Sequence, residues 1–367
     1  MNGIALWQRL RARMDWALVL TILAVAAIGL VNLYSSTRNA PVGGMFESQV
    51  RMMAIGGLVF LVASILDYRI FLRWSWLLLA VGVVTVVGVH FAGNVVKGSR
   101  RWIGFGGFAL QPSEFVKVAV ILGLARFIHD RDSEGVSLLG VGWRFAAFVG
   151  TIVMIAWQPD LGTAILVTLI CLSVATLAAK RIWPLVVGGA LATAALPLVW
   201  NYGLHAYQQK RVLTFLDPST DPSGAGWHTR QSIMAIGSGR LVGKGYLHGT
   251  QNQLSFLPEH WSDFPYAVWA EEWGFAGSVL LLGLYLFLIL WIVNVGSQAR
   301  DRYGATICLG VAAMVFWHVV VNISMVTGLA PVVGVTLPLV SHGGSSVLTF
   351  MIGLGLVNSV SIRRYTY

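Results

Sequence analysis

Stretches of about 20 consecutive, mainly apolar residues recur along this chain of 367 residues, and this is the length that an α-helix needs to cross a lipid bilayer. Apolar residues make up 56% of the chain and charged residues only 11%, against about 25% charged in soluble domains. The apolar runs are continuous rather than alternating, which favours helices over the strands of an outer-membrane barrel. The sequence therefore predicts an all-α polytopic membrane protein.

We predict about ten membrane-spanning helices, at 15–35, 49–67, 70–92, 112–129, 143–158, 161–179, 182–201, 265–296, 303–327 and 342–362. Fourteen of the 25 Lys and Arg residues lie in alternate connections, and the positive-inside rule makes that side cytoplasmic. Both termini are then cytoplasmic, and one long extracytoplasmic loop, about 202–264, joins the seventh and eighth helices. The first apolar run is too long for a cleavable signal peptide, so we expect residues 1–367 to form a single integral-membrane domain.

The remaining cations fall on or near the predicted outer face, where topology does not explain them. Arg100, Arg101 and Lys117 lie in or beside a short apolar connection, and Lys210 and Arg211 lie in the long loop. Long loops are translocated regardless of charge, so the loop cations can be simply solvated. For the cations near the short connection, an anionic ligand is the better explanation. Nucleic acid is not expected, because no soluble basic domain exists to bind it.

The stretch NVVKGSRRWIGFGGFALQPSEFVK, residues 94–117, combines cations and Trp102 with a glycine-rich apolar hairpin and the start of a helix. Ser113 can cap that helix, and Glu114 in its first turn favours the helix dipole. Lys117 lies three residues after Glu114 and so shares its helical face. Ionisable residues at membrane depth are costly and indicate a functional site, although a purely structural pair stays open. Gln111, Ser113, Glu114 and Lys117 are therefore candidate substrate-binding residues.

Two further segments bring polar groups toward the same face. In QPDLGTA, Asp160 opens a helix and is either only its cap or part of the site. In GVTLPLVSHGGSS, glycines, prolines and hydroxyls interrupt an apolar region, which is tolerated only where protein or a wet cavity surrounds the backbone. The candidates there are Ser341, His342, Ser345 and Ser346, whose helix start could face an anion or a sugar. A tightly packed helix start explains the same residues equally well.

The long loop ends in HGTQNQLSFLPEHWSDFPYAVWAEEWG, residues 248–274, which places Asp263 directly before an apolar helix. Asp before a Pro at the first helical position is a common helix start, so capping is the simpler interpretation of Asp263. His260 is a further candidate, and Glu271 and Glu272 can pair with cations inside the bundle. The segment 228–239 has amphipathic helical character that suits a membrane interface.

The sequence offers little sign of a resident metal or nucleotide. No His, Cys or carboxylate spacing is typical of a zinc or di-metal site, and no phosphate-binding P-loop is present. Cys171 and Cys308 lie inside predicted spans, where they suit apolar packing. The sequence therefore assigns no definite cofactor. A divalent cation could assist a diphosphate leaving group.

Together, KGSRRWI, QPSEFVK, QPDLGTA, HGTQNQLSFLPEHWSDFPYAVWAEEWG and GVTLPLVSHGGSS resemble the SEDS family (shape, elongation, division and sporulation), most closely its rod-shape branch. The resemblance implies a peptidoglycan glycosyltransferase that polymerises lipid II on the outer face of the bacterial cytoplasmic membrane. It implies a class B penicillin-binding protein and other elongation-complex proteins as partners. It also implies that the aspartate of the SDF stretch, Asp263, is catalytic.

The implied substrates suggest roles for the other candidates. An inverting displacement needs a base on the acceptor hydroxyl and positive charge on the leaving diphosphate. Arg101, Lys117, Lys210 and Arg211 are candidates for the diphosphate. A flippase for a lipid-linked precursor, or a non-catalytic scaffold for a penicillin-binding protein, are the alternative functions, and only the enzyme needs Asp263 as a base.

Overall fold

The computed structural model describes residues 14–38, 44–96, 99–105, 108–133, 138–158, 160–178, 183–204, 206–217, 221, 224–250 and 261–364. All ten predicted spans are helices: α2 (Trp16–Thr37), α3 (Met45–Ile65), α4 (Ile70–Ala92), α5 (Pro112–Ser133), α6 (Leu138–Trp157), α7 (Leu161–Ala178), α8 (Trp183–Leu198), α12 (Pro265–Ser297), α13 (Arg302–Val326) and α14 (Gly344–Arg363). In the described part of the chain, six helices are by length and composition able to cross a membrane. The chain is thus an all-α, multi-pass membrane protein, as predicted.

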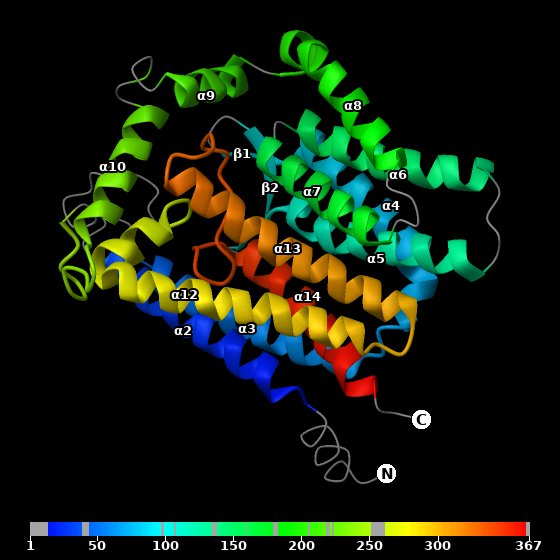
Figure 1. The fold of residues 1–367 in the computed structure, drawn as a ribbon, viewed down its shortest axis with the longest axis horizontal. Helices are drawn as coiled ribbons and strands as arrows, with labels where there is room; N and C mark the ends of the chain where they lie inside the picture. The colour runs from blue at the N-terminus through cyan, green and yellow to red at the C-terminus, as the bar shows by residue number, and fades with distance from the viewer. Residues whose placement is uncertain are drawn as a thin grey trace.

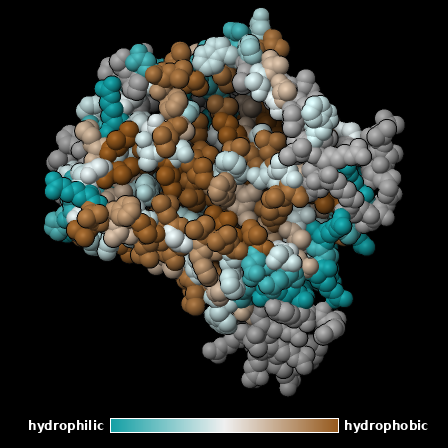
Figure 2. All heavy atoms as spheres, viewed as in Figure 1, coloured by the Kyte–Doolittle hydropathy of each residue, from teal (hydrophilic) through white to brown (hydrophobic). Residues whose placement is uncertain are grey.

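The described chain begins and ends at the same end of the bundle, as an even number of spans requires (Figure 1). Asp15, before α2, accepts a hydrogen bond from Ser361 at 2.8 Å and lies 3.8 Å from the guanidinium of Arg364. The outward-facing side chains are largely apolar, as Figure 2 shows for one face. Leu58, Val84 and Leu286 are each more than half exposed, which suits contact with lipid rather than water.

Helix α5 lies at the centre of the bundle and has two apolar faces. Val118, Ile121, Leu122 and Ala125 join the larger core, which α2, α3, α12, α13 and α14 form around it. Val116, Val120 and Leu124 face the other way, into a smaller core with α4, α6 and α7. Because α5 is buried on both sides, polar groups in its first turns are held deep in the protein.

The connection between α4 and α5 is a small antiparallel sheet of β1 (Asn94–Val96), β2 (Ser99–Phe105) and β3 (Phe108–Leu110). Strand β2 pairs with both neighbours, with Val95 opposite Arg100 and Gly104 opposite Ala109. The glycine-rich hairpin predicted here is confirmed. Strand β2 places Arg101 near the start of α5.

The described part of the predicted long loop contains helices. It contains a π-helical turn, η1 (Val199–Gly203), then α9 (Ala206–Leu216) and α10 (Ala225–Ser238). The amphipathic helix predicted at 228–239 corresponds to α10. Figure 1 shows α8, α9 and α10 arching along one side and one end of the bundle, and Figure 2 shows that the face beneath α8 and α9 is hollowed.

Helix α12 is broken near its start, at Gly274, whose φ of 63° lies in the left-handed region. The segment after α10 inserts into the break. The amides of Lys244 and Gly245 donate to the carbonyls of Glu271 and Glu272, both at 3.0 Å. The amide of Phe275 donates in return to the carbonyl of Arg240 at 2.8 Å. The outer loop thereby replaces the helical hydrogen bonds that the break removes, and it fixes the short first part of α12.

Candidate functional site

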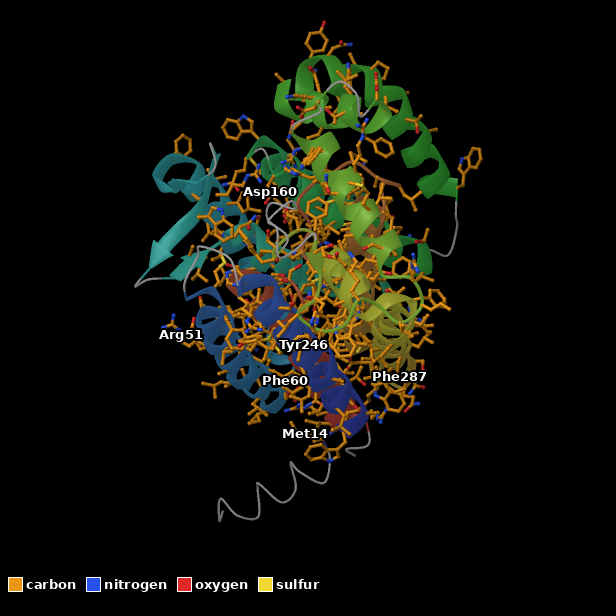
Figure 3. The ribbon with its side chains drawn as sticks, turned by 90° about the vertical axis from the view of Figure 1, so that its left-hand side faces the viewer. Met14, Arg51, Phe60, Asp160, Tyr246 and Phe287 are labelled. Atoms are coloured by element: carbon orange, nitrogen blue, oxygen red, sulfur yellow. The ribbon has the colours of Figure 1, made fainter. Side chains whose placement is uncertain are left out.

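The carboxylate of Asp160 joins three elements at one end of the bundle. Gln111 and Ser113, at the start of α5, donate to its Oδ2 at 2.7 and 2.8 Å. Arg101 of β2 lies 3.8 Å from its Oδ1. Oδ1 also accepts from the amide of Thr163 in the first turn of α7 at 3.4 Å. Asp160 is thus both a helix cap and part of a polar cluster, and Figure 3 shows it near the outer helices, far from Met14.

The start of α14 packs against this cluster. The hydroxyl of Ser345 accepts from the amide of Gln111 at 2.9 Å. Gln49 of α3 holds the preceding turn, since it accepts from the amide of Gly343 and donates to the carbonyl of Ser341, both at 3.2 Å. The start of α14 is therefore packed against α3 and the segment before α5. These contacts occupy the Gly343 amide and the Ser345 hydroxyl, which were candidates for an anion.

Lys117 is fully buried, and all three of its N–H groups have protein partners. Two reach the carboxylate oxygens of Glu114 at 2.9 and 2.8 Å, which confirms the predicted pairing. The third reaches Nε2 of His318 at 2.8 Å. The carbonyl of Thr336 can only accept, so Nδ1 of His318 donates to it at 2.9 Å and Nε2 is the acceptor for Lys117. Direct contact of Lys117 with a ligand would require one of these bonds to open.

Asp263 lies in the turn before α12, one residue ahead of the N-cap, Phe264. Its carbonyl accepts from Asn322 of α13 at 3.0 Å. Its carboxylate faces Gly334, where a Cβ would lie 3.7 Å from Oδ2. His342 lies beside the same turn, because its amide donates to the carbonyl of Trp261 at 2.8 Å.

The segment 331–336, between α13 and α14, connects these groups. The carbonyl of Val332 accepts from Arg211 at 3.0 Å, and the next residues contact Asp263, Asn322 and His318. The hydroxyls of Thr336 and Ser346 lie 2.8 Å apart. Since the segment has no regular secondary structure, its backbone carbonyls are available as acceptors for side chains from α9 and α13.

A pocket of about 110 Å³ opens beside this segment. Two arginines and one glutamine line it together with apolar residues. Its lining is formed by Arg101, Leu161, Ile165, Gln208, Arg211, Val212, Pro331 and Val333. A cationic pocket with apolar walls is suited to an anionic group carried on a lipid.

Three predicted residues lie elsewhere. Lys210 is adjacent to Arg211 on α9 but points away, toward Asp221 at 3.4 Å, and its side chain is 64% exposed. Trp102 pairs with Asn94 in the sheet and does not line the pocket. His260 lies outside the described residues.

Sequence reasoning missed His318, Asn322 and Gln208, all of them at most 2% exposed. A signal for the first two was present. They are polar residues four positions apart in an otherwise apolar span, and so they face the same direction on α13. Among the described residues, no group of three or more His, Cys, Asp or Glu side chains is arranged to bind a metal ion.

The family model FtsW/RodA/SpoVE, described as cell cycle protein, matches residues 15–366. The chain belongs to this family. The chain is 39% identical over 364 residues to the peptidoglycan glycosyltransferase MrdB of Escherichia coli K12, covering 99% of this chain and 97% of MrdB. It is 33% identical to the peptidoglycan glycosyltransferase RodA of Treponema pallidum, covering 95% and 98%.

Solved FtsW/RodA/SpoVE-type structures have the same fold. A chain of a peptidoglycan synthase complex that coordinates polymerization and crosslinking matches with a TM-score of 0.79 and 31% identity, covering 96% of this chain and 99% of that chain. The rod shape determining protein RodA of Thermus thermophilus matches with a TM-score of 0.71 and 27% identity, covering 96% and 98%. The family predicted from the motifs is confirmed.

Proposed function

We propose that this chain polymerises lipid II into β-1,4-linked glycan strands, with Asp263 as the general base. One observation carries the residue assignment: neighbouring residues of the segment 331–336 contact the cationic pocket and the Asp263 carboxylate. Val333 lines the pocket, and Gly334 is the residue beside Oδ2 of Asp263. A base and an anion site are therefore adjacent, as a displacement at a sugar diphosphate requires.

The enzyme class follows from the relatives that match nearly the whole chain. They are peptidoglycan glycosyltransferases, and this chain is a glycosyltransferase of that class. The rod-shape branch rests on the 39% identity to MrdB, since RodA of Treponema pallidum at 33% and a probable FtsW of Trichlorobacter lovleyi at 34% do not separate the two branches. We therefore assign the activity to cell elongation rather than division.

In the proposed reaction, Asp263 takes the proton of the acceptor sugar hydroxyl. The hydroxyl oxygen bonds to the anomeric carbon of the donor strand, while the bond from that carbon to the diphosphate oxygen breaks. A single displacement inverts the configuration and releases polyprenyl diphosphate. Arg101 and Arg211 stabilise the charge on the leaving group, because guanidinium groups bind phosphate oxygens in pairs.

The Glu114–Lys117 pair is buried and does not line the pocket. Since its ammonium donors are all used internally and its charge is paired with Glu114, Lys117 holds α5 against His318 of α13 rather than making a first contact with the substrate. Gln111 and Ser113 fix the Asp160 carboxylate by hydrogen bonds, and Asp160 orients Arg101 through their ion pair. Ser345 ties the same cluster to α14.

The protein would work in the bacterial cytoplasmic membrane with the site facing outward. The positive-inside pattern supports this orientation, because the described termini share the end opposite the site. A class B penicillin-binding protein is the proposed partner. Its support is the match to a chain of a synthase complex that coordinates polymerization and crosslinking.

The test is strand synthesis from purified lipid II by the full chain with its crosslinking partner. Asp263→Asn should abolish polymerisation while the protein stays folded and partner-bound. Asp217→Asn is the matched control, since Asp217 is an exposed carboxylate in the same long loop and should leave the rate unchanged. Normal synthesis by Asp263→Asn would remove the base and favour a flippase or a scaffold.

A further inference from the structure

Asn322 of α13 is completely buried and bridges two backbone carbonyls. Its Nδ2 donates to the carbonyl of Asp263 at 3.0 Å and to the carbonyl of Val335 at 2.7 Å. Both partners can only accept, so the orientation of the amide is settled by its own contacts. Rotating the amide would bring its oxygen against two carbonyl oxygens.

The bridged carbonyls belong to segments that are far apart in the chain. One is the turn before α12, and the other is the segment 331–336 beside the cationic pocket. Two carbonyls cannot bond to each other, so a donor between them sets their separation. Within the described residues, Oδ1 of Asn322 has no hydrogen-bond partner, and the amide is therefore held by these two donated bonds.

Asn322 can hold the Asp263 turn in place because the helix that carries it is fixed in the core. Asn322 projects from a helix whose neighbouring residues, Val319 and Met325, are packed in the core. On the other side, Gly334 brings the pocket segment against the Asp263 carboxylate. Loss of the bridge would remove the donor that the two carbonyls share and would free the turn that carries Asp263 to move relative to the pocket.

We propose that Asn322 is a positioning residue that sets the distance between the Asp263 carboxylate and the pocket segment. This rests on the proposed role of Asp263 as the base. Asn322 acts through the Asp263 backbone and does not touch the reacting atoms. A misplacement of about 1 Å can cost on the order of 100-fold in rate, so small movements of this turn have large effects.

The test compares kcat and KM for lipid II in full-length variants with the crosslinking partner present. Asn322→Leu keeps the side-chain size but removes both donors. It should lower kcat by about 10- to 100-fold while KM changes by less than about 3-fold, because Asn322 itself does not line the pocket proposed to bind the diphosphate. Asn322→Thr keeps one hydroxyl donor and should fall between Asn322→Leu and the wild type.

The matched control is Asn358→Leu. Asn358 is also fully buried, but it accepts from the amide of Asp15 at the opposite end of the bundle, so kcat should be unchanged. A kcat within 2-fold of wild type in whichever Asn322 variant folds, or an equal fall in Asn358→Leu, would overturn the inference. Asp263→Asn in the same assay separates the two ideas: if it is active, the base assignment fails, and if it is inactive while Asn322→Leu is normal, only the positioning role fails.

Discussion

The buried Lys117 gives the sharpest prediction about stability. Lys117→Met replaces the ammonium by an uncharged chain of similar length at a site with no solvent exposure. Glu114 and Nε2 of His318 then both lose their donor. Breaking a buried ion pair on one side typically costs 3–5 kcal/mol, because the remaining charge is left uncompensated, so we expect a loss of about 4 kcal/mol.

Removing both charges should reverse most of that loss. In Lys117→Met/Glu114→Gln, no unpaired carboxylate remains, and replacing a whole buried pair is often nearly neutral. We therefore expect the double variant to be more stable than Lys117→Met by about 2 kcal/mol or more.

The measurement is thermal unfolding of the purified protein in one detergent at fixed pH. At about 2 °C per kcal/mol, the single variant should unfold about 8 °C below the wild type. Lys210→Met serves as the stability control, because Lys210 is 64% exposed and its pair with Asp221 should contribute little. A single variant within about 2 °C of wild type, or a double variant less stable than the single, would refute the argument.

Two further predictions concern Asp301 before α13 and the break in α12 at Gly274. Burial raises the pKa of Asp301, but hydrogen bonds from Tyr68, the Gly304 amide and Arg69 outweigh it and lower the pKa overall. The stability that Asp301 contributes is thus present above its ordinary pKa of about 4 and is lost as pH falls through the lower pKa of the folded state. Asp301→Asn should therefore destabilise the protein at pH 7. It should also weaken the dependence of the unfolding temperature on acid pH. Gly274→Ala should prevent correct folding, because its Cβ would lie 2.3 Å from the Gly243 amide at a φ of 63°. The control is Gly283→Ala, at a position in open space on the same helix, which should be neutral or stabilising. Equal expression and equal unfolding temperatures of the Gly274→Ala and Gly283→Ala proteins would contradict the inserted loop.

Sequence patterns predicted every long helix because each apolar run needs lipid or a core on all sides. The ends of the runs were predicted less well: α6 begins at Leu138 rather than near 143, and α5 continues to Ser133 rather than 129. Charged residues explain the second difference, since Asp130 and Arg131 lie in the last turns of α5 beyond the predicted span. Arg126 and Asp130 pair at 2.6 Å along the helix and so extend it past the hydrophobic signal.

The candidate site was predicted where one local segment carried the information. Glu114 and Lys117 are three residues apart on one helix, so their pairing follows from helix geometry alone. Asn322 and His318 escaped prediction because their partners lie in other segments, in the turn before α12 and in 335–336. The separation of Lys210 from Arg211 also needed the packing of α9 to be known.

The sequence by itself determined that the chain lies in a lipid bilayer, the positions of ten long apolar helices and the family, because hydrophobic length and contiguous motifs are local properties of the chain. Tertiary structure alone decided which donors were already occupied. Lys117 has no N–H left for a ligand, Arg101 and Arg211 meet across a pocket, and the outer loop completes the break in α12. These outcomes depend on hydrogen bonds between residues distant in the chain, and such bonds form only after the helices have packed.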